Sequence, residues 1–165
     1  VINGIIGLPV IKEMKEIHIR SNEIFIPKQK TTGTLANMLI DGFIPTIEVI
    51  EGADSLAFTF DTGAKATMLY SSYYLRNKAK IESKYEAEEI EFGGAGGTIK
   101  VKGFRLEDLL LKIGNSKLKL SNVRVIAENI KDHDKGYFGN LGQDYMSEFG
   151  EMILNFEDMY VDFKK

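Results

Sequence analysis

The sequence of 165 residues has no cysteine, no tryptophan and only two histidines. Without cysteine the chain has no disulfide, no thiolate metal ligand and no thiol nucleophile. The histidines, His18 and His133, stand alone in the sequence, whereas a metal site needs two or three ligands at set spacing. We therefore expect no metal and no cofactor. The sequence also lacks an apolar run of the ~20 residues that a membrane-spanning helix needs, so we expect no membrane span.

An excess of charge of one sign is missing as well. Twenty-one basic and 24 acidic side chains give a net charge of −3 and a pI near 5.5. A general nucleic-acid-binding protein would carry a basic face, so we expect no nucleic-acid partner. The composition, 44% hydrophobic and 27% charged, is that of a globular protein. A chain of this length can bury roughly 70% of its unfolded surface, so it can fold without a disulfide or a metal.

An internal repeat relates the two ends of the chain. Residues 4–28, moved forward by 135 positions, fall on residues 139–163, so that Gly7 falls on Gly142. Matching apolar pairs include Ile6/Leu141, Val10/Tyr145, Ile11/Met146, Ile24/Met159 and Ile26/Val161. Each copy predicts a strand end, about two helical turns and a hairpin. Common ancestry of the two copies is the favoured interpretation, and chance similarity of two helix–hairpin units is the alternative.

The chain between the two copies reads almost entirely as short strands with frequent turns. Asp41-Gly42 is a favoured hairpin signal, and residues 70–77 suggest a helical turn. Strands at 109–113, 117–120 and 123–127 are predicted to be separated by Gly114-Asn115 and Ser121-Asn122. The pattern predicts an all-β barrel or sandwich with short helices. Residues 29–36 are the best linker candidate.

A strand over residues 56–60 is predicted to deliver Asp61-Thr62-Gly63 at its end. An aspartate after a buried strand sits on a rigid support, and Gly63 lets the backbone turn tightly and approach a substrate. Taken alone, the tripeptide is equally an ordinary exposed turn.

The second candidate element is a hairpin over residues 91–101 with a glycine-rich tip, Gly93-Gly94-Ala95-Gly96-Gly97. A phosphate-binding loop is excluded, because no Lys-Ser/Thr follows and the chain continues as a strand rather than a helix. A flexible hairpin tip can close over an extended peptide as a lid. The alternative is a surface hairpin without such a role.

In their order along the chain, these motifs resemble those of the retropepsin-type aspartic protease family. Residues 60–69 are similar to its catalytic loop, and residues 92–101 to its flap. Asn140-Leu141-Gly142 and Ile5-Ile6-Gly7 both resemble the apolar-apolar-Gly motif that closes each lobe. The resemblance implies an all-β, closed acid-protease-type barrel lobe over residues 37–165. It also implies that residues 1–28 are the C-terminal tail of a preceding lobe.

In this family, two Asp-Thr-Gly loops face each other across a two-fold axis and their carboxylates share a proton. The ionised carboxylate activates a water, and the protonated one donates to the peptide carbonyl. The resemblance thus implies that Asp61 is one half of the pair. Thr62 would bond across the axis to the opposite loop, and Gly63 would accept the substrate backbone. The further substrate-binding residues that it implies are Ala64, Gly93, Gly94, Ala95, Gly96 and Gly97.

The sequence departs from the family in two ways. Lys65 and Gln143 stand where viral relatives have an acidic residue paired with an arginine, so that ion pair is absent. A swapped pair between Lys65 and Asp144 is a hypothesis for the structure to test. The chain also has one Asp-Thr-Gly only. The second aspartate would come from a lobe upstream of Val1, the favoured source, or from a homodimer.

The upstream-lobe interpretation predicts that the hairpins over residues 15–28 and 150–163 lie side by side. The expected function is an aspartic endopeptidase with a peptide or protein substrate. The alternatives are a non-catalytic peptide- or protein-binding module, the inactive half of a two-lobed protease, or an unrelated barrel. A bacterial periplasmic or secreted location follows only by analogy with the family.

Overall fold

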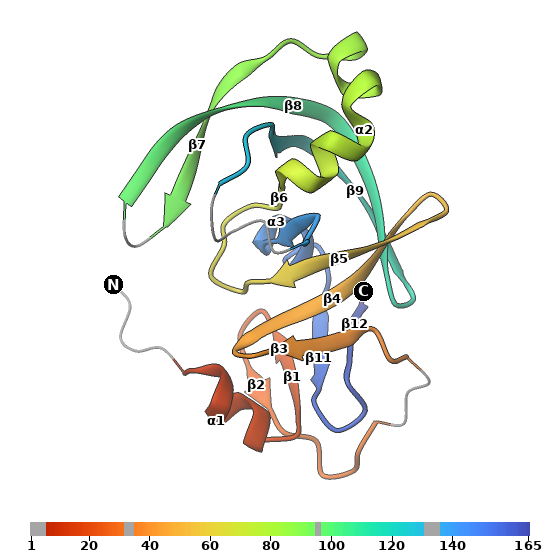
Figure 1. The fold of residues 1–165 in the computed structure, drawn as a ribbon. Coiled ribbons are helices and arrows are strands. Elements are labelled where there is room, and N and C mark those ends of the chain that lie inside the picture. The colour runs from red at the N-terminus through yellow and green to blue at the C-terminus, as the bar shows by residue number, and fades with distance from the viewer. Residues whose placement is uncertain (1–5, 32–34, 95–96, 131–135) are drawn as a thin grey trace.

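Two β-sheets carry most of the chain in a computed structural model, which describes residues 6–31, 35–94, 97–130 and 136–165 (Figure 1). The strands are β1 (Glu16–Arg20), β2 (Ile24–Phe25), β3 (Met38–Asp41), β4 (Ile44–Glu51), β5 (Asp54–Phe60), β6 (Met68–Leu69), β7 (Glu88–Gly94), β8 (Gly97–Ile113), β9 (Ser116–Ile126), β10 (Gly139–Leu141), β11 (Glu151–Asn155) and β12 (Tyr160–Lys164). The helices are α1 (Leu8–Glu13), α2 (Ser71–Lys84) and α3 (Gln143–Met146). None of these helices is long and apolar enough to cross a membrane.

The larger sheet has the strand order β3-β4-β5-β10-β6-β9-β8-β7. Its long strand β8 bends back to pair with β4, where Ile50 lies opposite Lys112, and this extra pairing closes the sheet on itself. Alternate residues of β4, β5, β8 and β9 point inward and form the apolar core. The predicted all-β fold with short helices is therefore confirmed.

One local prediction was right in kind but too short, and another was wrong. The helical turn expected at residues 70–77 is the 14-residue helix α2, which buries Tyr73, Tyr74 and Ile81 and stacks the Tyr74 ring on Phe104 at 5.5 Å between centroids. The predicted break at Ser121-Asn122 does not end a strand: β9 runs through it, because asparagine tolerates the left-handed conformation seen at Asn122 (φ 55°). Pairing with the unbroken β8 then holds β9 in register on both sides of that residue.

The smaller sheet, of order β12-β11-β1-β2, joins the two ends of the chain. Its central pair is β1 and β11, in which His18 lies opposite Ile153 and Glu16 lies opposite Asn155. His18 and Ile153 are also equivalent positions of the 135-residue repeat. An antiparallel ladder centred on two equivalent residues maps onto itself when the two copies are exchanged. The predicted side-by-side placement of the hairpins is thus confirmed, with a local two-fold symmetry.

The outer strands of this sheet correct the sequence alignment of the two copies. Phe25 lies opposite His18, whereas Asp162 lies opposite Ile153, so the outer strands correspond with an offset of 137 rather than 135. Ile24 is therefore equivalent to Val161, and Ile26, two residues further on, to Phe163. The second hairpin needs the larger offset because its turn has four residues, 156–159, whereas the first turns through residues 21–22.

Candidate active site

The loop that follows β5 carries the candidate aspartate. Phe58 and Phe60 of β5 are buried in the core and anchor the strand end, and the next residue, Asp61, is exposed. The Asp61 backbone N–H donates to the carbonyl of Leu141 on the neighbouring parallel strand β10 (3.3 Å). The Gly63 N–H donates to Asp61 Oδ1 at 2.8 Å. The backbone thus orients one carboxylate oxygen, on a rigid support that faces open space.

Thr67 fixes the far end of the same loop. Its hydroxyl donates to Asp144 Oδ1 at 2.6 Å, and its backbone N–H donates to the same oxygen at 2.8 Å. The Thr67 hydroxyl in turn accepts from the Gly142 N–H at 3.1 Å. A Cβ atom on Gly142 would lie 2.5 Å from the carbonyl carbon of Ala66, so only glycine allows this approach. The sequence signalled this threonine only through its place in the motif.

Gln143 makes the remaining bonds between the two segments. Its Nε2 donates to the Thr62 carbonyl at 2.7 Å, and its backbone N–H donates to the Ala64 carbonyl at 2.9 Å. The hypothesis of a Lys65–Asp144 ion pair is wrong: no such pair occurs among the described residues, and the Asp144 carboxylate accepts from Thr67 instead. The neutral amide of Gln143 thus makes the side-chain bond to this loop.

The predicted glycine-rich hairpin is formed by β7 and β8, which stay paired up to Gly94 and Gly97. It reaches over the side of the molecule to which β5 runs (Figure 1). Gly93 has a φ of 156°, and a Cβ atom there would lie 2.1 Å from the Gly97 carbonyl oxygen. The close approach of the two paired strands at the tip therefore requires glycine. Ala95 and Gly96, the two remaining tip residues, lie outside the described residues.

The base of the hairpin is anchored by a small apolar cluster separate from the main core. Its buried members are Met68, Tyr70, Ile90, Val101, Ile126 and Tyr137. The cluster ties β7 and β8 to β6, which follows the candidate loop directly. Tyr137 adds a bond to the barrel, because its hydroxyl donates to Asp41 Oδ2 at 2.7 Å. This bond, together with burial, raises the pKa of Tyr137.

A cluster of three polar side chains, Thr59, Asn140 and Tyr70, lies near the candidate aspartate, and the sequence did not predict it. Thr59 Oγ1 donates to Asn140 Oδ1 at 2.8 Å and lies 3.5 Å from the Tyr70 hydroxyl. The signal was available: strand alternation places Thr59 on the side of β5 opposite the buried Phe58 and Phe60. The contact with Asn140 could not be predicted from the sequence, because it depends on β10 lying next to β5.

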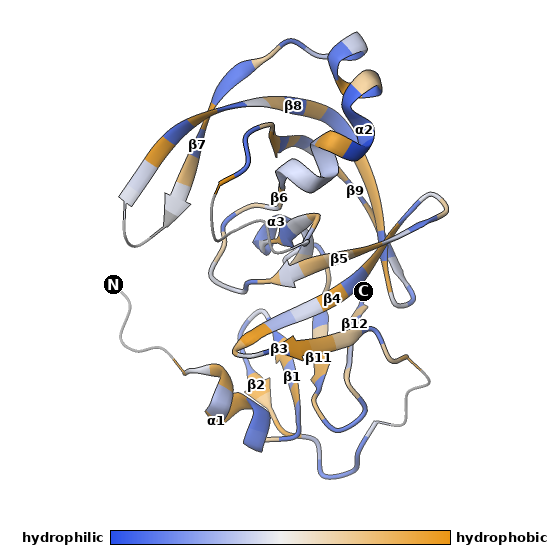
Figure 2. Ribbon diagram, in the orientation of Figure 1, coloured by the Kyte–Doolittle hydropathy of each residue, from blue (hydrophilic) through white to orange (hydrophobic). Residues whose placement is uncertain are grey.

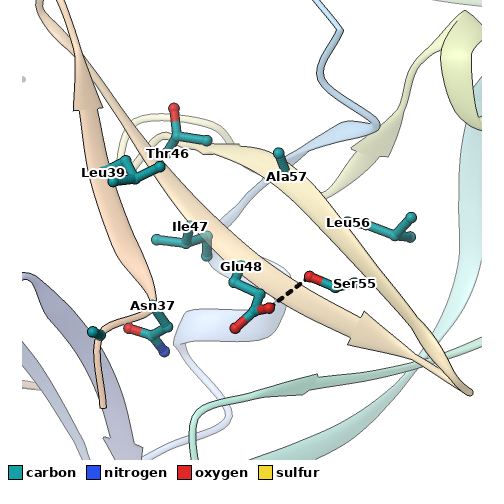
Figure 3. Close-up of a pocket in the computed structure, with 9 residues that line it drawn as sticks. Asn37, Leu39, Thr46, Ile47, Glu48, Ser55, Leu56 and Ala57 are labelled. Atoms are coloured by element: carbon teal, nitrogen blue, oxygen red, sulfur yellow. Dashed lines mark hydrogen bonds between the residues drawn. The ribbon is translucent and has the colours of Figure 1, made fainter.

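An open groove of about 320 Å³ lies elsewhere on the barrel (Figure 3). Its lining residues are Ala36, Asn37, Leu39, Thr46, Ile47, Glu48, Ser55, Leu56 and Ala57. Ser55 and Ala57 belong to the first half of β5, whereas Asp61 follows its end. Thr46 of β4 also lines the groove and lies opposite Thr59, two residues before Asp61, so the groove runs along β4 and β5 towards that loop. Asp61 itself does not line it.

Acidic side chains surround His18 in the small sheet. Its ring nitrogens lie 2.8 Å from Glu16 Oε1 and 3.2 Å from Glu151 Oε1, and Arg20 also bonds to Glu151. Burial by itself raises the pKa of both glutamates, but hydrogen bonds, chiefly from Thr31 and His18 to Glu16 and from His18 and Arg20 to Glu151, leave each pKa below its usual value. No group of three metal-ligating side chains is found in the part of the chain that the structure describes. His133 lies outside that part.

No protein-family model matches the sequence, and no curated protein matches it. Among solved structures, the chain is similar to the EIAV protease complexed with the inhibitor HBY-793, with a TM-score of 0.42 and 21% identity over 72% of this chain and 93% of that one. It is also similar to a retropepsin-like aspartic protease from Rickettsia conorii, with a TM-score of 0.43 and 16% identity over 76% of this chain and 89% of that one.

Proposed function

We propose that the chain supplies one half of the active site of a retropepsin-type aspartic endopeptidase, with Asp61 as one of two catalytic carboxylates. The observation that carries this proposal is the geometry of the loop. A backbone N–H orients the exposed Asp61 carboxylate, and bonds from residues 142–144 fix both ends of the loop. The rigidly anchored glycine hairpin reaches over the same side of the molecule.

Each part of the site then has a defined task. Two carboxylates held close together share one proton, because both cannot ionise without strong repulsion. The ionised one removes a proton from a water that attacks the peptide carbonyl, and the protonated one donates to the carbonyl oxygen. Thr62 makes a hydrogen bond to the loop of the opposite lobe, and Gly63 and Ala64 bind the backbone of the substrate. Residues 93–97 close over the bound peptide.

The second carboxylate comes from another lobe. We assign residues 1–28 to the tail of that lobe, residues 29–36 to a linker and residues 37–165 to the lobe that carries Asp61. The small sheet supports this assignment, because β1 occupies the edge of β11 with two-fold symmetric pairing. A second copy of the chain cannot pair its own β11 at an edge that β1 already fills. A lobe preceding residue 1 is therefore favoured over a homodimer.

The experiment is cleavage of a mixed peptide library between pH 3 and 7, with the chain alone and with the chain extended upstream. We expect Asp61→Asn to lower cleavage by at least ~100-fold, since general acid–base catalysis contributes about 10²–10⁴-fold. Asp108→Asn is the matched control, because Asp108 pairs with Lys119 on the exposed barrel surface. Equal cleavage by the Asp61→Asn variant would refute the proposal. Peptide binding without cleavage by the extended protein would leave the alternative, a peptide-binding module.

A further inference from the structure

The groove on the outer face of β3, β4 and β5 has a distinct chemical character. Strand alternation places five of its lining side chains on one face of the sheet, opposite the core: Leu39, Thr46, Glu48, Ser55 and Ala57. Thr59 continues this face along β5, and Asp61 follows it. The groove and the candidate aspartate thus belong to one continuous surface.

Glu48 is the one charged residue among those that line the groove. Its Oε1 accepts a hydrogen bond from the Ser55 hydroxyl at 2.6 Å across the strand pair (Figure 3). No basic side chain pairs with it among the described residues, whereas Asp54, the residue before Ser55, pairs with Arg76. A carboxylate that is already oriented and has no cation can bind a basic group at a small cost in ordering.

Apolar surface beside this carboxylate suits the stem of a long basic side chain. Leu39 of β3 is 71% exposed, and Ala57 of β5 lies directly opposite Glu48. Figure 2 shows β3 as apolar over most of its length, whereas β4 alternates between apolar and polar segments. Lysine and arginine lay their methylene groups along such a surface and keep the charged end free for a carboxylate. The groove is therefore suited to a basic side chain rather than an acidic one.

The end of the groove nearest the candidate aspartate is polar. Thr46 lies there, opposite Thr59 and two strand residues away from the level of Asp61. Its side chain is 6% exposed, and its hydroxyl has no hydrogen-bond partner among the described residues. The neighbouring Tyr137 hydroxyl donates to Asp41 instead. A buried hydroxyl without a partner is rare, and in the wall of a groove it is a group that a bound peptide can satisfy.

We infer that this groove binds an extended segment of the polypeptide substrate to one side of the scissile bond, with a lysine or arginine side chain held by Glu48. Glu48 lies opposite Ala57, four residues before Asp61, which corresponds to ~13 Å along the strand. An extended substrate covers that distance with about four residues. The basic residue would thus stand about four positions from the cleaved bond. The inference deepens the proposed function and rests on it only in taking the bound peptide to be the substrate.

Peptide binding tests the groove without any cleavage. The probes are two labelled peptides of about ten residues, long enough to span the groove, one alternating threonine with lysine and one alternating threonine with glutamate. Fluorescence anisotropy measures their affinity for the Asp61→Asn protein, and we expect the lysine peptide to bind more tightly. Glu48→Gln should weaken its binding by about threefold to fivefold, the upper part of the range for an exposed ion pair. Glu48→Lys should reverse the preference.

Glu86 supplies the matched controls, because it is exposed, lies outside the groove and has no ion pair in the part of the chain that the structure describes. Glu86→Gln and Glu86→Lys change the net charge by the same amounts and should leave both affinities nearly unchanged. As a second test, Ala57→Lys places an ammonium directly opposite Glu48 and should block the lysine peptide. Equal affinity for the two peptides, no binding of the lysine peptide, or equal losses in the Glu48 and Glu86 variants would overturn the inference.

Cleavage by the chain extended upstream separates this inference from the proposed function. Among the peptides cleaved from the library, lysine and arginine should be enriched about four residues from the cut bond. Glu48→Lys should replace them by acidic residues. Cleavage without this enrichment would overturn the inference and leave the function in place. Binding of the lysine peptide at Glu48 without any cleavage would refute the function and leave the groove as a site for basic peptides.

Discussion

The two copies of the repeat differ in what surrounds them rather than in their pattern. Both consist of a glycine, a short helix and a hairpin, and both hairpins share one sheet. The second copy buries Tyr145 and Met146 of its helix, whereas the helix of the first copy buries none of its residues fully. An amphipathic pattern therefore predicts which side of a helix or hairpin can join a core. Whether that side is buried depends on the element that packs against it. The first copy has the pattern of a core-closing element without the core.

The largest expected effect that separates the copies comes from truncating their equivalent helix residues. Tyr145→Ala should lower the free energy of unfolding by about 3–5 kcal/mol, because it empties a fully buried aromatic position. Val10→Ala should change it by less than about 0.5 kcal/mol in the isolated chain, because that side chain is exposed. Urea denaturation of both variants measures the contrast. Similar losses in the isolated chain would mean that the first copy already has its core.

The equivalent glycines provide the next contrast. Gly142→Ala would bring a Cβ atom to 2.5 Å from the carbonyl carbon of Ala66, so it should destabilise the chain by about 1–3 kcal/mol and displace the Asp61 loop. The nearest atom to a Cβ on Gly7 is Pro9 Cδ at 3.6 Å, an ordinary contact, so Gly7→Ala should be neutral in the isolated chain. Thermal unfolding checks both. A neutral Gly142→Ala would contradict the close packing of the two segments.

Asp144 has a carboxylate that accepts hydrogen bonds from the loop at Thr67, whereas its equivalent in the first copy, Pro9, has no side-chain acceptor. Both Thr67 donors bond to a single Asp144 oxygen, and an asparagine oxygen can replace it. Asp144→Ala should therefore cost about 1–2 kcal/mol by leaving the buried Thr67 N–H without an acceptor. Asp144→Asn should retain most of the stability. Urea midpoints of the two variants decide, and equal losses would indicate that the charge, rather than the acceptor, matters.

The smallest effect concerns Glu16 and Glu151, equivalent residues that flank His18. Hydrogen bonds hold the pKa of each below the usual 4.5, against the opposing effect of burial. A group with a lowered pKa in the folded state stabilises the fold above its unfolded pKa, and this contribution disappears as the pH falls through the folded value. Glu151→Gln should therefore destabilise the chain at pH 7, and the deficit should shrink below pH 4.5.

Urea midpoints between pH 7 and pH 3 test this expectation, with the exposed Glu86→Gln as control. If the stability lost in Glu151→Gln grew towards acid pH instead, the expected direction of the pH dependence would be contradicted.

Much of the barrel could be read from the sequence because its signals are local. The hairpin signalled by Asp41-Gly42 forms, but one residue later than the signal places it: Asp41 pairs with Ile44 and the turn is Gly42-Phe43, with Gly42 at a φ of 62°. Asp61 follows a buried strand, as alternation predicts. The length of α2 was not predictable in this way, because its buried side is set by contact with distant residues such as Phe104. The role of Asp144 depends likewise on a loop 77 positions away in the chain.

The sequence by itself determined the repeat, because aligning the chain with itself is enough to find it. It also determined the Asp-Thr-Gly loop, the glycine hairpin and the alternation of the barrel strands, because each of these depends on residues near one another in the chain. Only the tertiary structure decided the two-residue shift between the hairpins, the hydrogen bonds that hold the candidate loop, and the opposite burial of the two copies. These features depend on pairing and packing between distant segments. A periodic pattern cannot specify them, because it records which side of an element is apolar and not what lies against it.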